Sequence, residues 1–356
     1  MSRKTLTLAS AITLTILLVL SLALTFYFAQ LVSLDAIISC IIGVVLSLAF
    51  APIFHELGHI VVADLVKMQI VYAKLFCVKL LRKRGKLRVR FASPFTADET
   101  QAVPKTSGNM YKRARAYTLG GLLFGGGFVV LLVVLSIAFA LVNAPNFLYL
   151  GMLPYSVYLF IFNALPLEYA VGKTDALIYK NLKKGEPAEK NMLCAMEIQG
   201  LLFEGKSFAE IDESLYFNVQ QLSEEEPLFA VMLDLRYRYY LEKGDMEKAG
   251  DCLNRLIDSQ EYLPLEELQK VAGECVYMYS LIGDLARAEE SGKIAKPYLS
   301  GDSASAKRIL ATFTATFGDK ATAKILQKQA QTALSYEHNQ GVKKFESILL
   351  SRIELE

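Results

Sequence analysis

The sequence predicts a mainly α-helical protein in two parts: a polytopic transmembrane helical domain of about four spans with a small cytoplasmic β-hairpin, then a soluble α-helical repeat domain. Long apolar runs in the first half, a recurring Gly-Asp pattern in the second and a change of charge between them predict this. Residues 1–167 hold 15 basic and 5 acidic side chains, whereas residues 168–356 hold 23 and 31. A chain of 356 residues with 53% hydrophobic content has room for several domains and suits membrane segments.

Four uncharged stretches reach the length of about 20 residues that a helix needs to cross a bilayer. They are 5–34, 36–54 with a continuation towards Asp64, 116–142 and 144–167. The first is too long for the core of a signal peptide, so residues 1–35 are expected to be an N-terminal transmembrane anchor.

The distribution of Lys and Arg predicts the orientation of these spans. Arg3 and Lys4 precede the first span, and the loop 67–115 carries 13 basic residues, whereas the connections around Asp35 and around 143–146 carry none. The N-terminus, this loop and everything after Pro166 are therefore expected to be cytoplasmic. Five scattered cysteines without a CxxC spacing suit a reducing compartment.

The loop 67–115 contains a predicted β-hairpin. Residues 69–91, QIVYAKLFCVKLLRKRGKLRVRF, are rich in β-branched and aromatic residues around a turn at 83–86, with Gly85 at the expected positive φ. Three interpretations stay open. The hairpin could rest on anionic headgroups, offer an edge strand to an extended peptide, or be a solvated hairpin without either role.

The third span is rich in glycine, at positions 120, 121, 125, 126 and 127. The Gly121-x-x-x-Gly125 spacing lets another helix approach closely. Helix packing is preferred here over a direct role with substrate.

The second half carries a repeat. Gly-Asp-x-x-x-Ala occurs at Gly244, Gly283 and Gly318, each time between two stretches with helical periodicity. A helix, a Gly-Asp turn and a second helix, repeated near 34 residues, resembles a tetratricopeptide array, so residues 181–356 are expected to bind a protein partner. An irregular helical bundle with chance Gly-Asp turns is the alternative.

The end of the second span carries the pentad His55-Glu56-Leu-Gly-His59. Residues i and i+4 share a helix face, so the two imidazoles can bind one Zn²⁺, with Glu56 beside them to take a proton from water. Such a pentad also arises by chance in soluble helices. At the edge of a membrane span, however, ionisable side chains are costly and usually functional, which favours the metal site. A catalytic zinc needs a third protein ligand, for which Glu168 and Asp175 are candidates.

Beyond the fourth span, Asn163-Ala-Leu-Pro166 is followed by Asp175. With the pentad, this resembles the site-2 protease family of intramembrane zinc metalloproteases, over residues 36–180. The spacing from proline to aspartate is longer than the common form, and Ala176 replaces the usual glycine. The resemblance favours Asp175 over Glu168 as third zinc ligand beside His55 and His59.

The same resemblance implies a function. Glu56 would be the general base, and Asn163 would hold the substrate backbone or an oxyanion. The expected activity is hydrolysis of a peptide bond in or near a transmembrane segment of a membrane protein or of a leftover signal peptide. The expected location is a bacterial cell membrane, as a multi-pass protein.

Two alternative functions remain: a non-catalytic membrane scaffold that keeps a zinc site and binds partners through its repeats, and, less favoured, a metal transporter. Nucleotide binding at VGKTD (171–175) is rejected because position 167 is Leu167 rather than glycine. Nucleic-acid binding is not expected, because the position of the basic loop beside membrane spans explains its charge.

Overall fold

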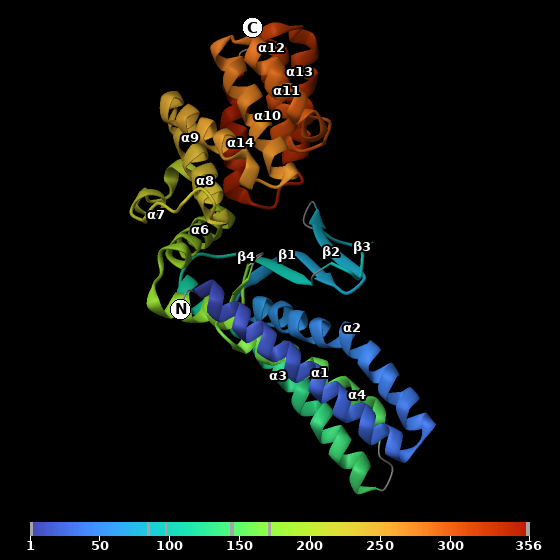
Figure 1. Ribbon diagram of the computed structural model, residues 1–356. Coiled ribbons are helices and arrows are strands. Elements are labelled where there is room, and N and C mark those ends of the chain that lie inside the picture. Colours follow the sequence, from blue (N-terminus) through green and yellow to red (C-terminus); the bar gives the residue numbers. More distant parts are fainter. Residues whose placement is uncertain (1–2, 84–85, 97, 143–145, 170–171, 354–356) are drawn as a thin grey trace. The chain divides into compact units, whose positions relative to one another are not determined.

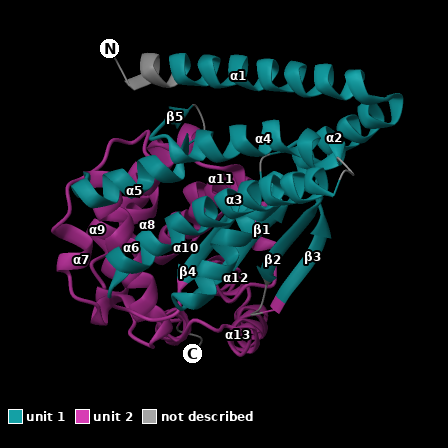
Figure 2. Ribbon diagram, turned by 90° about the horizontal axis from the view of Figure 1, so that it is seen from below, with its two compact units in different colours: residues 1–83, 87–103, 109–186 teal, residues 84–86, 104–108, 187–356 magenta. Residues whose placement is uncertain are grey.

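The computed structural model describes residues 3–83, 86–96, 98–142, 146–169 and 172–353. It divides into two compact units, residues 1–83, 87–103 and 109–186 in the first and residues 84–86, 104–108 and 187–356 in the second (Figure 2). The structure is mainly helical, as predicted.

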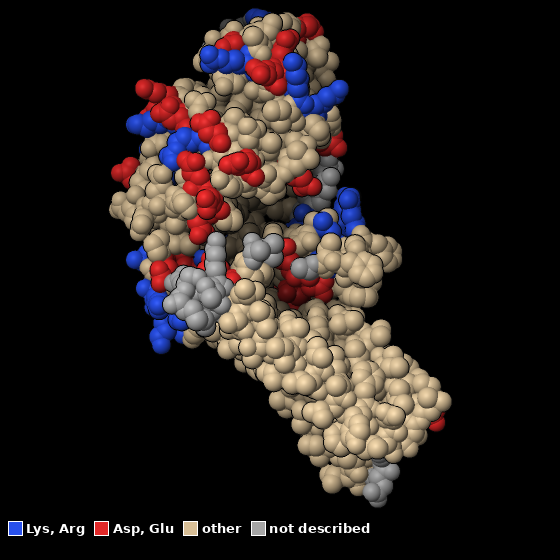
Figure 3. Space-filling view, in the orientation of Figure 1, with Lys and Arg blue, Asp and Glu red and all other residues tan. Residues whose placement is uncertain are grey.

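The first unit is built on five helices (Figure 1). They are α1 (Arg3–Val32), α2 (Leu34–Leu65), α3 (Met110–Leu141), α4 (Phe147–Ala164) and α5 (Asp175–Lys184). The first four are long and apolar enough to cross a membrane, which confirms the four predicted apolar segments. Their surface is almost free of charged side chains (Figure 3), as expected of helices that face lipid.

Polar side chains cap two of these helices, α2 and α4. Ser33 ends α1 and caps α2, its hydroxyl accepting a hydrogen bond from the Ala36 N–H at 3.1 Å. Asn146 caps α4 in the same way, through the Leu148 N–H at 3.0 Å. These caps satisfy backbone donors that the first turn of a helix leaves free.

Glycine contacts set where the long helices cross. A Cβ at Gly58 would lie 2.1 Å from the Gly120 carbonyl oxygen, and one at Gly120 would lie 2.6 Å from the Gly58 oxygen, so α2 and α3 touch backbone to backbone. Gly43 and Gly151 provide the same contact between α2 and α4. The third span does approach another helix closely, but the backbone contact is at Gly120, beside the predicted Gly121-x-x-x-Gly125 spacing, and its partner Gly58 lies inside the His-Glu pentad.

The predicted hairpin is wrong in its extent, because the loop forms a four-stranded sheet. Its strands are β1 (Met68–Leu75), β2 (Val78–Lys83), β3 (Lys86–Phe91) and β4 (Glu99–Pro104), in the order β3-β2-β1-β4. The expected turn at 83–86 falls between β2 and β3, and its Gly85 lies outside the described residues. β3 is exposed throughout and alternates Leu87, Val89 and Phe91 with basic residues.

The missed turn joins β1 to β2 at Phe76 and Cys77. Phe76 has φ 53°, a conformation that sequence patterns assign to glycine or asparagine. Asp98, which is far from Phe76 in the sequence, stabilises this turn. Its carboxylate accepts a hydrogen bond from the Phe76 N–H at 2.9 Å and pairs with the buried Lys74 ammonium at 2.7 Å. A turn stabilised by a residue 22 positions away leaves no local signal.

From residue 187 to residue 353 the second unit is built of helices. Its helices are α6 (Pro187–Phe203), α7 (Ser214–Phe217), α8 (Pro227–Lys243), α9 (Met246–Asp258), α10 (Leu265–Ile282), α11 (Leu285–Leu299), α12 (Ala304–Phe317), α13 (Lys320–Leu334) and α14 (Gln340–Ser351). Two 3₁₀ turns, Phe208–Glu210 and Gln260–Tyr262, complete it.

The Gly-Asp pattern marks the turns of three helical pairs, α8–α9, α10–α11 and α12–α13. Asp245, Asp284 and Asp319 each cap the second helix of a pair through its backbone N–H groups. Gly244 and Gly283 end the first helix with φ 81° and 76°, whereas Gly318 has φ −130°. The tetratricopeptide assignment stays a prediction.

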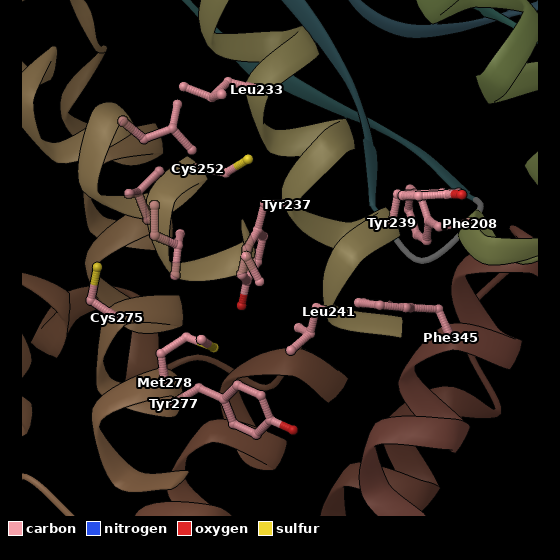
Figure 4. Close-up of a cluster of buried hydrophobic side chains, with 14 of the residues drawn as sticks. Phe208, Leu233, Tyr237, Tyr239, Leu241, Cys252, Cys275, Tyr277, Met278 and Phe345 are labelled. Carbon is pink, nitrogen blue, oxygen red and sulfur yellow. The ribbon is translucent and has the colours of Figure 1, made fainter. Parts of the chain in front are cut away.

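The core of this unit joins α8, α9 and α10 (Figure 4). Tyr237, Tyr277 and Leu241 are fully buried there. A charged cluster lies within the same unit: the Arg308 guanidinium donates to Glu274 and to Glu346, both at 2.7 Å, and is itself fully buried.

Candidate metal centre

Three side chains converge from two helices of the first unit. His55 and His59 lie one turn apart near the end of α2, and Asp175 is the first residue of α5. Asp175 Oδ2 lies 3.2 Å from His55 Nε2 and 3.3 Å from His59 Nε2. Within the described part of the chain, these three residues form the one group of at least three His, Cys, Asp or Glu side chains with the spacing of metal ligands.

The spacing fits a zinc ion. Tetrahedral zinc with bonds of about 2.0–2.2 Å places neighbouring ligand atoms about 3.3–3.4 Å apart. Asp175 Oδ2 is buried and has no hydrogen-bond partner in the described structure, although two imidazole nitrogens lie within 3.3 Å. This convergence of two imidazole nitrogens and one carboxylate oxygen is the arrangement expected of ligands around a shared cation.

The His59 ring is fixed from its other nitrogen. Nδ1 lies 2.9 Å from the Tyr117 carbonyl oxygen on α3, and because a carbonyl only accepts, Nδ1 carries the proton. Nε2 is then the nitrogen with a free lone pair, as metal binding requires. The Tyr117 ring also lies against His59, with centroids 4.9 Å apart.

Thr174 sets the position of Asp175. Its buried hydroxyl donates to the Leu165 carbonyl at 2.6 Å and accepts the Leu167 N–H at 3.0 Å. Its own N–H donates to the Leu167 carbonyl at 3.0 Å. These hydrogen bonds join the start of α5 to the residues that follow α4, and they hold Asp175 next to the two histidines.

Arg115 joins α3 to α5 one turn further on. Its guanidinium donates to the Tyr179 hydroxyl and lies 4.7 Å from the centre of that ring.

Burial alone would raise the pKa of the Asp175 carboxyl, but the adjacent imidazoles of His55 and His59 outweigh burial and lower it. Asp175 therefore stays in the carboxylate form that binds a cation.

Gly121 keeps the centre open on the side of α3. A Cβ at this position would lie 2.5 Å from His59 Nε2 and 2.7 Å from His55 Nε2. Any side chain here would fill the space in front of both ligand nitrogens. The sequence indicated helix packing for the third-span glycines, and the structure adds that this one faces the centre.

Glu56 lies beside the ligands and is buried, with 8% of its surface exposed. The Thr100 hydroxyl lies beside this carboxyl, and Oε2 has no other hydrogen-bond partner among the described residues. A buried carboxylate with so few partners is costly, which is tolerated where the group has a chemical task.

Two further predicted residues, Asn163 and Glu168, are not members of this group of three. Asn163 Nδ2 donates to the Leu159 carbonyl of its own helix at 3.1 Å, and its role with substrate stays a prediction. Glu168 lies in β5 (Glu168–Tyr169), opposite Lys173 in β6 (Gly172–Lys173), and does not belong to the ligand group. Asp175 is thus the candidate that the fold brings to the histidines.

Sequence reasoning missed three residues at this centre, Thr100, Tyr117 and Thr174, and the contact of Gly121 with the imidazoles. None belongs to the pentad, and they reach it only through the packing of α3, α5 and β4. Comparisons of this chain with protein-family models, with curated proteins and with solved structures gave no match.

Proposed function

We propose that the protein is an intramembrane zinc metalloprotease that hydrolyses a peptide bond in or near a transmembrane segment. The observation that carries this proposal is the convergence of His55, His59 and Asp175 on one point, with the buried Glu56 carboxylate beside it. A purely structural zinc site closes with four protein ligands, whereas three ligands leave a position for chemistry.

When bound, zinc makes water acidic enough to deprotonate near neutral pH and polarises the scissile carbonyl. The chain supplies the remaining steps. Glu56 takes a proton from the attacking water, whose oxygen bonds to the carbonyl carbon. The same carboxyl then passes that proton to the amide nitrogen as the C–N bond breaks, giving one carboxylate and one amine.

The apolar helices around the candidate site favour membrane-embedded segments as its substrates. Four helices of the first unit are apolar enough to span a bilayer, and the pentad lies in the last three turns of one of them. Peptide bonds of a membrane helix are hidden by its own hydrogen bonds, so the helix has to unwind before hydrolysis. Free backbone groups of the unwound segment would then need new partners.

An outer strand of the sheet is our proposed partner for that segment. β1 has neighbours on both sides, so the first strand of the predicted hairpin has no free edge for substrate. β3 and β4 are the outer strands. β4 is favoured, because the Thr100 carbonyl in this strand accepts the Tyr117 hydroxyl at 2.6 Å, and Tyr117 also contacts His59.

The proposal can be tested by measuring the zinc content and the proteolytic activity of the purified protein. Detergent-solubilised native chain should contain about one zinc per molecule and cleave fluorescently labelled casein, an unfolded probe that needs no helix unwinding. Glu56→Gln should retain zinc and lose activity, whereas His59→Ala should lose both. If the native chain binds zinc and cleaves neither casein nor membrane peptides, the scaffold function replaces the protease.

A further inference from the structure

A second polar side chain faces the candidate base. Thr100 is in the outer strand β4, and its hydroxyl lies beside the Glu56 carboxylate. Apart from this approach to one another, neither Thr100 Oγ1 nor Glu56 Oε2, both buried, has a hydrogen-bond partner among the described residues. Buried oxygens with so few partners are costly, and one water that bonds to both would give each a further partner.

The position of Thr100 is fixed through the same residue that orients a zinc ligand. The Tyr117 hydroxyl donates to the Thr100 carbonyl at 2.6 Å, while the Tyr117 carbonyl accepts from His59 Nδ1 at 2.9 Å. This path links β4 to α2 through α3. These hydrogen bonds therefore fix the position of Thr100 relative to the candidate ligands and to Glu56.

Resting on the proposed function, we propose that Thr100 is a positioning residue that orients the attacking water. Glu56 Oε2 accepts one proton of that water, and Thr100 Oγ1 accepts a hydrogen bond from the other. With both O–H bonds directed, a lone pair of the oxygen faces the carbonyl carbon. When Glu56 has taken its proton, the water oxygen forms the new C–O bond while Thr100 keeps the second proton in place.

Two substitutions separate this role from packing. Thr100→Val keeps the shape and loses the hydroxyl, whereas Thr100→Ser keeps the hydroxyl and loses the methyl group. A packing role predicts that valine is the milder change, and the water-orienting role predicts the reverse. Thr96→Val, at an exposed position before the same strand, is the matched control.

The assay is casein hydrolysis by the full chain in detergent, with zinc content measured in every variant. Losing this hydrogen bond should lower kcat of Thr100→Val about 10- to 100-fold with KM within about twofold. Thr100→Ser should stay within about threefold of the native kcat, and Thr96→Val should match the native chain. The absorption spectrum of the cobalt-substituted protein should be the same in all four, because the three ligands are unchanged.

Three results would overturn the assignment. Equal kcat in Thr100→Val and native protein would remove it while leaving the protease intact. A cobalt spectrum altered in Thr100→Val would show that Thr100 acts on the ligands instead. Absence of hydrolysis by the zinc-loaded native chain would overturn the proposed function itself, and this assignment with it.

Discussion

Replacing Gly121 by alanine adds one methyl group directly in front of the candidate ligands. The new Cβ would lie 2.5 Å from His59 Nε2 and 2.6 Å from His55 Cε1. Non-bonded heavy atoms prefer about 3.5–4.0 Å, so the imidazoles or the α3 backbone must move by about 1 Å. The backbone cannot move freely, because the adjacent Gly120 already contacts Gly58 of α2.

A zinc site tolerates displacements of about 0.2 Å in its ligand distances. Changes at supporting residues cost about 10- to 100-fold in metal affinity, and a direct clash with two ligands should cost at least the upper end. We therefore expect Gly121→Ala to weaken zinc binding about 100-fold or more, or about 2.7 kcal/mol.

Gly127→Ala is the matched control, because it lies on the same helix and its Cβ would meet nothing within 4 Å. Zinc affinity is measured by competition with a chromophoric chelator on detergent-solubilised protein. Gly127→Ala should bind zinc as the native chain does. If Gly121→Ala also binds zinc with native affinity, the centre does not lie where α3 faces His55 and His59.

Three further predictions follow from other contacts. Asp175→Asn should lower zinc affinity about 10- to 100-fold or more while Glu168→Gln leaves it unchanged, and the opposite order in chelator competition would make Glu168 the ligand. Thr174→Val should weaken zinc binding about 10-fold through loss of its hydroxyl contacts with Leu165 and Leu167, with Thr174→Ser close to native; equal affinities would show that the loop needs no such tie. Arg308→Met leaves Glu274 and Glu346 buried without their partner, which should cost about 3–5 kcal/mol of stability. Arg308 lowers the pKa of Glu274 in the native fold, whereas burial raises that of Glu346. Without Arg308 both carboxyls should bind protons in the folded state, so the deficit should shrink as pH falls from 8 to 5, and thermal unfolding with a pH-independent deficit would contradict this.

The sequence predicted most of what has local causes. Apolar runs of span length, the helical spacing of His55 and His59, and the Asp caps after Gly244 and Gly283 are properties of short segments, and the structure shows each of them. The ligand set that the resemblance implied, with Asp175 as its distant member, is the set that the fold brings together.

The remaining features depend on contacts between distant segments. The turn at Phe76 relies on Asp98, so no pattern of turn residues marks it. Thr100 reaches Glu56 because β4 is the outer strand beside β1, and no pattern in the sequence predicts β4. Gly58 lies within the pentad and contacts the backbone of Gly120 on α3, which the pentad alone does not indicate.

The most direct test of the central claim compares cells that carry the native chain with cells that carry Glu56→Gln. Quantitative membrane proteomics would map new peptide termini, and zinc would be measured in both purified proteins. The account predicts that at least one membrane protein or signal peptide accumulates uncut in the mutant, while both proteins hold the same amount of zinc. Identical termini in the two cell lines, with zinc bound in both proteins, would contradict it.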